Sequence, residues 1–112
     1  MSRASQRKGA AGERELAAIL RGRGYDIERG GSLSYGEVPD LVGLPGVHIE
    51  VKRVERLNVP EAMDQATRDA DRFGGFPALF HRRSRSPWLV TMRLADWLEL
   101  YQAFEDKERA VP

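Results

Sequence analysis

The chain is short, nearly neutral in charge and free of cysteine. Of its 112 residues, 41% are hydrophobic and 31% are charged, which predicts one globular domain over residues 1–112 with a single core. The absence of cysteine excludes disulfides and thiolate-bound zinc or iron–sulfur sites. No apolar run approaches the roughly 20 residues of a membrane span, and no apolar signal segment follows the first basic residues, so we expect a cytoplasmic protein.

The net charge of +1 hides an uneven distribution along the chain. Basic residues are concentrated in the first thirty positions and again at residues 52–56, whereas many of the acidic residues fall in predicted helices. Such a polarised surface could present a basic face to a phosphate backbone, although each cluster could also be an ordinary solvated surface. The residues that we expect to contact DNA are Arg7, Lys8, Arg14, Arg29, Arg53 and Arg56.

The first predicted elements are a flexible arm and a helix. Residues 1–8 are polar and basic and are expected to form the arm, and the helix should occupy residues 9–23. Glu13 lies on the same helical stripe as the apolar Leu16, where a carboxylate is costly unless something pairs with it. Glu13 is therefore either a site residue or a first-turn acid favoured by the helix dipole, a role that Glu15 fits equally well.

Three short strands should follow the helix. Residues 25–29 alternate in polarity, residues 40–44 and 47–53 are apolar runs, and a flexible loop over residues 30–36 leads toward the second run. The turn between the second and third strands is short, so these two strands should form a hairpin.

The second half of the chain is expected to add a helix, two strands and a final helix. We place these elements at residues 60–73, 78–80, 88–91 and 94–107. The order of elements predicts an α/β fold with a central mixed five-stranded sheet flanked by helices. The expected buried face of the last helix consists of Leu94, Trp97, Leu98 and Tyr101.

The most informative residues are Asp40, Glu50 and Lys52. Strand residues two apart share a face, so Glu50 and Lys52 should point together while Ile49 and Val51 point into the core. The hairpin would place Asp40 beside Glu50. Two oxygen ligands next to a cation suit Mg²⁺ and phosphodiester hydrolysis. The alternative is an ordinary ion pair on an exposed strand.

The motif Pro39-Asp40…Glu50-Val51-Lys52 resembles that of the PD-(D/E)XK nucleases, which implies a restriction-endonuclease-like core. A wider match is similar to the archaeal-type Holliday junction resolvases and covers about residues 8–91. Its further segments are Lys8-Gly9…Glu13-Arg14-Glu15-Leu16, Gly24-Tyr25-Asp26-Ile27-Glu28-Arg29, Gln65-Ala66 and Phe73-Gly74-Gly75-Phe76-Pro77.

This resemblance implies a homodimer that binds four-way DNA junctions and cuts two strands symmetrically with Mg²⁺, for which Mn²⁺ could substitute. Asp40 and Glu50 match the metal-binding carboxylates, and Lys52 matches the catalytic lysine. Glu13 matches a first-helix acid near the metal, and Ser32 falls near an active-site serine in a mobile loop.

Three more residues complete the expected site. The carbonyl of Val51 is a plausible third metal ligand, and Gln65 resembles a supporting glutamine of the later helix. His48 shares a strand face with Glu50 and could lie at the site, whereas His81 is more readily explained as a DNA-contacting or solvent residue.

Other functions stay open at this point. A nuclease of the same superfamily could act on flaps, nicks or plain duplex, and a DNA-binding module could keep the fold without catalysis. The combination of two carboxylates and a lysine argues against the non-catalytic module. A small-molecule α/β enzyme would need a glycine-rich phosphate loop, and the sequence offers only a weak candidate for one.

Overall fold

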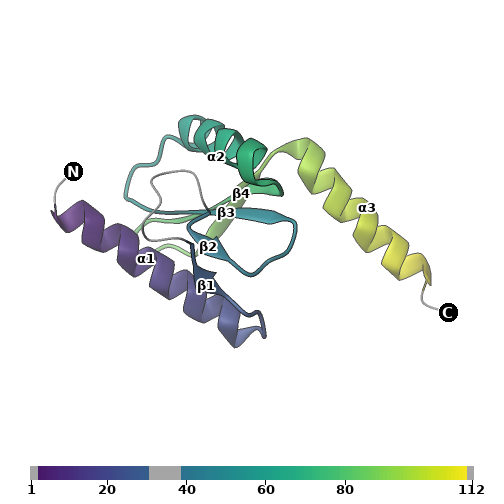
Figure 1. Ribbon diagram of the computed structural model, residues 1–112, viewed down its shortest axis with the longest axis horizontal. Helices are drawn as coiled ribbons and strands as arrows, with labels where there is room; N and C mark the ends of the chain where they lie inside the picture. The colour runs from purple at the N-terminus through teal and green to yellow at the C-terminus, as the bar shows by residue number, and fades with distance from the viewer. Residues whose placement is uncertain (1–2, 31–38, 111–112) are drawn as a thin grey trace.

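The predicted α/β architecture is confirmed. The computed structural model describes residues 3–30 and 39–110, with the backbone alone for residues 3–8. Within these ranges a mixed five-stranded sheet is flanked by helices (Figure 1). The elements in chain order are α1 Arg3–Gly22, β1 Glu28–Arg29, β2 Leu41–Val42, β3 Val47–Arg53, α2 Val59–Phe73, β4 Phe76–Arg82, β5 Leu89–Met92 and α3 Leu94–Ala110.

The sheet has the order β1-β2-β3-β4-β5, so neighbours in space are also neighbours in sequence. β3 and β4 are parallel, and the other three pairs are antiparallel. A parallel pair needs a crossover connection, which α2 supplies. The predicted hairpin is confirmed, because β2 pairs with β3 in a register that sets Leu41 opposite Ile49.

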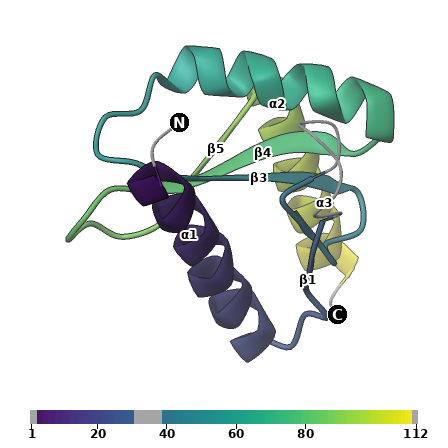
Figure 2. The same ribbon diagram turned by 60° about the vertical axis from the view of Figure 1, so that its left-hand side comes forward.

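Helices α1 and α2 cover opposite faces of the sheet (Figure 2). Gly12 lets α1 approach β3 closely, since a Cβ at this position would lie 2.6 Å from the Cβ of Arg53. The core between α1 and the sheet consists of Leu16, Ala17, Ile27, Leu41, Ile49 and Val51. On the other side, the buried residues of α2 are Ala62, Ala66 and Ala70.

The first two predicted boundaries need correction. α1 begins at Arg3, so residues 3–8, expected to be a flexible arm, are helical, as their alanine, glutamine, arginine and lysine content allows. β1 is shorter than predicted. The N–H of Tyr25 donates to the Leu20 carbonyl and that of Ile27 to the Tyr25 carbonyl, so this segment completes the end of the helix before the strand begins.

The predicted buried face of α3 is wrong. This helix extends away from the sheet (Figure 1), and Leu94, Trp97, Leu98 and Tyr101 are 46–70% exposed. The residue of α3 that is buried is Asp96, whose Oδ2 accepts a hydrogen bond of 2.7 Å from Arg93 Nε. Helical spacing correctly groups the four apolar residues on one stripe, but it does not say whether another element covers that stripe.

In the part of the chain that the structure describes, no helix has the length and apolar character required to cross a membrane.

Candidate active site

The β2–β3 hairpin brings Asp40 to the middle of β3. The N–H of Asp40 donates to the Ile49 carbonyl at 2.9 Å, and Asp40 Oδ2 accepts a hydrogen bond of 2.7 Å from the Val51 N–H. These two bonds hold the Asp40 carboxylate against the strand that carries Glu50. The two carboxyl groups are hydrogen-bonded to each other. The predicted approach of Asp40 to Glu50 is therefore confirmed.

The buried carboxyl pair is electrostatically strained. Burial raises the pKa of Glu50 to about 9, with further increases from the charges of Asp40 and Asp69, while Lys52 opposes the shift. Burial also raises the pKa of Asp40, against the hydrogen bond from Val51. At a pKa of about 9, the Glu50 carboxyl group stays protonated near neutral pH and donates a hydrogen bond to Asp40. Two oxygen donors that resist ionisation together fit a divalent metal, whose charge would compensate both.

Lys52 supplies the positive charge of this centre. It follows Glu50 by two residues on β3 and is half-buried. Its charge lowers the pKa of Asp40 and of Glu50, so the ammonium group is near both carboxyl groups. As predicted, Glu50 and Lys52 share one face of β3, while Ile49 and Val51 lie in the core on the opposite face.

Glu13 reaches the edge of the site from α1. Its Oε2 accepts hydrogen bonds from Arg29 Nη2 at 2.9 Å and Nε at 3.2 Å. Burial raises the pKa of Glu13, and the charge of Asp40 raises it further, so Glu13 is near Asp40. Glu15 points elsewhere: it contacts Arg82 and accepts a 2.8 Å hydrogen bond from Trp88 Nε1, so it ties α1 to β4 and to the segment before β5.

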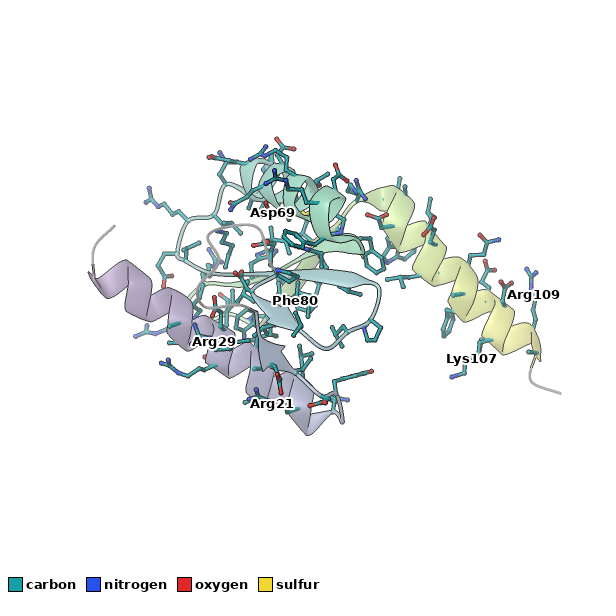
Figure 3. The ribbon with its side chains drawn as sticks, in the orientation of Figure 1. Arg21, Arg29, Asp69, Phe80, Lys107 and Arg109 are labelled. Atoms are coloured by element: carbon teal, nitrogen blue, oxygen red, sulfur yellow. The ribbon has the colours of Figure 1, made fainter. Side chains whose placement is uncertain are left out.

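His48 and Asp69 add a second layer behind Glu50. His48 is 1% exposed, and its Nε2 lies 3.0 Å from Glu50 Oε1. Asp69 comes from α2 (Figure 3), and one of its carboxylate oxygens lies within 4.8 Å of a ligand atom of His48 and of Glu50. Sequence reasoning singled out His48 but missed Asp69. A signal was present, because Asp69 follows Gln65 by four residues and so shares its side of α2, where Gln65 is half-buried.

The predicted DNA-contacting residues are scattered over several elements. Arg14 and Arg56 are exposed, and Arg29 remains 52% exposed despite its pairing with Glu13. Arg53 is half-buried, with its Nη1 3.4 Å from Ser84 Oγ.

Four other residues were singled out from the sequence. The side chains of Arg7 and Lys8 lie outside the described residues, and so does Ser32. His81, for which we expected a DNA-contacting or solvent position, is half-buried, with its Nε2 2.8 Å from Thr91 Oγ1 across the β4–β5 pair. Burial lowers the pKa of His81.

A mixed sheet with one carboxyl group immediately before β2, a second on β3 and a lysine two residues after the second is the arrangement of the PD-(D/E)XK nuclease class. Residues 4–104 match the family model of the archaeal Holliday junction resolvase (Hjc), and the chain belongs to this family. The protein is therefore a resolvase-type nuclease that binds DNA junctions, and membership implies a divalent metal.

A solved relative supports this assignment. The Holliday junction resolvase Hjc of Archaeoglobus fulgidus, an archaeal hyperthermophile, superimposes with a TM-score of 0.56 at 26% sequence identity. The match covers 75% of this chain and 76% of that one. No curated protein matches the chain.

Proposed function

We propose that this protein resolves Holliday junctions by Mg²⁺-dependent hydrolysis at the site formed by Asp40, Glu50 and Lys52, with Mn²⁺ as an alternative metal. The main support is the buried Asp40–Glu50 pair, which is held by the Val51 N–H and retains a proton when no cation is present. A buried pair of this kind is a poor structural element, because burial disfavours its charged form, but a suitable metal ligand set.

Asp40, Glu50 and the Val51 carbonyl would hold the metal. When bound, the metal would polarise a phosphate oxygen and lower the pKa of a bound water. Lys52, on the same strand face, orients the attacking water or stabilises the negative charge that develops on the phosphate. Asp40 keeps its position through the Val51 N–H, so the ligand geometry is set before substrate arrives.

The remaining predicted residues have supporting roles in this proposal. Glu13 holds a second metal or positions Lys52 from the edge of the site. Ser32 contacts the phosphate, and Gln65 supports the site from α2. The DNA backbone is bound by basic side chains, namely Arg7, Lys8, Arg14, Arg29, Arg53 and Arg56.

We also propose that the working unit is a homodimer in the cytoplasm. The site described above provides one reaction centre per chain, and symmetric cutting of two strands requires two, which a two-fold dimer supplies. The exposed apolar stripe of α3, which includes Trp97 and Tyr101, is surface that such a dimer could bury.

The test compares a labelled four-way junction with a matched linear duplex, in Mg²⁺ or in EDTA. We expect paired symmetric nicks in the junction alone, only with metal. Asp40→Asn should abolish cutting and leave junction binding largely intact, whereas Asp26→Asn, at an exposed acid, should cut like the wild type. Continued cutting by Asp40→Asn would refute the site.

The same experiment separates the alternative functions. Cutting of both substrates would indicate a nuclease of this class with another natural target, such as flaps, nicks or duplex. Junction binding without cutting, under metal conditions in which a known nuclease is active, would indicate a non-catalytic module. Sedimentation of the free protein and of its junction complex would test the homodimer.

A further inference from the structure

A second group of metal-binding side chains lies beside the proposed catalytic pair, on the side of α2. It consists of His48, Glu50 and Asp69, which come from β3 and from the helix that covers this face of the strand. The side chain of His48 is 0% exposed and that of Glu50 is 7% exposed. The two members on β3 are therefore buried, and Asp69 on α2 is half-buried.

Two polar atoms in this group lack a hydrogen-bond partner. His48 Nδ1 and Asp69 Oδ2 are both buried, and neither finds a partner within the described part of the chain. A buried polar atom left unsatisfied costs about 1–3 kcal/mol. Most such atoms in native proteins are satisfied, and a bound water or ion is a common explanation for the exceptions. A bound water or ion in this cluster could satisfy both atoms.

The geometry of the cluster suits a metal ion. One donor atom from each of the three residues lies within 4.8 Å of the other two. In a tetrahedral site, metal–nitrogen and metal–oxygen bonds of roughly 2.0–2.2 Å place any two donor atoms about 3.3–3.6 Å apart, so donors as far apart as 4.8 Å would move closer together by about 1 Å on binding. His48 already lies 3.0 Å from Glu50.

The donor set also indicates which metal. Mg²⁺ prefers oxygen ligands and usually keeps several waters, whereas one imidazole with two carboxylates is a set that transition metals accept readily. The Asp40–Glu50 pair offers oxygen donors alone. The two neighbouring sites therefore differ in chemical preference, although both use Glu50.

We propose that His48, Glu50 and Asp69 bind a divalent transition-metal cation such as Zn²⁺, at a second site that shares Glu50 with the Asp40 site. This site does not include Glu13, which comes from α1 and is near Asp40. The inference rests on the described cluster and needs no particular DNA substrate, so it can fail or succeed separately from the proposed cleavage reaction.

The test is a titration of the 112-residue chain with Zn²⁺ in excess Mg²⁺, monitored by calorimetry and by the ¹⁵N resonances of the His48 ring. We expect Zn²⁺ binding that shifts the His48 nitrogens. Asp69→Asn should weaken this binding at least about tenfold, because it removes a ligand. Asp71→Asn, at an exposed acid on the same helix, is the matched control and should bind like the wild type.

Three results would overturn the proposal: no Zn²⁺ binding in excess Mg²⁺, His48 resonances that do not move, or equal affinity in Asp69→Asn and wild type. The wild-type resonances need no substitution, so they decide the question even if a variant does not fold. Asp40→Asn should keep the His48 response while losing cleavage. Loss of cleavage without loss of the His48 response would separate the catalytic proposal from this one.

Discussion

The two faces of β3 differ more than any other pair of surfaces in this protein. One face places Ile49 and Val51 in the apolar core under α1, and the other places His48, Glu50 and Lys52 under α2. The first face stabilises the fold by removing apolar surface from water, whereas the second buries carboxyl groups at an energetic cost. One seven-residue strand thus separates stability from chemistry by the two-residue period of its side chains.

The helices that cover the two faces differ in the same way. α1 contributes larger apolar side chains such as Leu16, while the buried residues of α2 are three alanines. Small side chains let α2 approach the strand without filling the space around Glu50 with apolar groups. The polar face therefore carries the side chains that could bind a ligand, whereas the apolar face stabilises the fold.

The largest expected effect follows loss of a carboxylate from the polar face. Glu50→Gln should lower the single-turnover rate of junction cleavage by a factor on the order of 10³ or more, since metal stabilisation of the transition state amounts to several kcal/mol. The protein should remain folded. The matched control, Glu61→Gln at an exposed residue of α2, should retain the wild-type rate. A Glu50→Gln rate within tenfold of wild type would remove Glu50 from the metal site.

The opposite result is expected on the apolar face. Ile49→Ala should reduce the free energy of unfolding by about 2–5 kcal/mol, because Ile49 is 0% exposed and its loss leaves a cavity. Under conditions where the variant is folded, its cleavage rate should stay near that of the wild type. Urea denaturation and cleavage assays on one preparation would check both points. A cost below about 1 kcal/mol would mean that this face collapses around the gap.

The buried proton of Glu50 makes the stability of the metal-free protein pH-dependent. Its pKa is about 9 in the folded state and near 4.5 when unperturbed, so the folded state holds a proton that the unfolded chain has released. Ionisation of Glu50 leaves the free energy of unfolding unchanged below pH 4.5. As pH rises from 4.5 toward 9, it lowers that free energy by at most about 1.4 kcal/mol per pH unit.

Urea denaturation in EDTA, measured between pH 5 and pH 8.5 in steps of about one pH unit, would give this loss of stability. Glu50→Gln should flatten the dependence because it cannot ionise, and Mg²⁺ should reduce it in the wild type because the metal favours the ionised carboxylate. Parallel pH profiles for wild type and Glu50→Gln in EDTA would contradict the assignment of the buried proton to Glu50.

The smallest effect is expected at the edge of the polar face, where Arg29 pairs with Glu13. Arg29 is about half exposed, so Arg29→Gln should cost only about 0.2–1 kcal/mol, and less at high salt. Denaturation in low and high salt would measure it, with Arg23→Gln at another exposed arginine as control. A salt-independent loss above about 2 kcal/mol would show that the pair has a structural role that its exposure does not suggest.

Much of this molecule could be predicted from local patterns. The alternation in β3, the short turn before it and the order of the elements were sufficient to predict the mixed sheet and to bring Asp40 to Glu50. These features depend on residues a few positions apart, whose relative orientation is set by strand and helix geometry. The family resemblance rests on the same short segments.

Contacts between distant elements could not be predicted in this way. The stripe of α3 has the spacing of a buried face but is exposed, and Asp69 approaches Glu50 from α2, a separate element that follows β3 in the chain. Sequence spacing determines which side chains share a face, because backbone geometry is local. Which faces are covered, and which remote carboxylate approaches Glu50, was decided only by how α2 and α3 pack relative to the sheet.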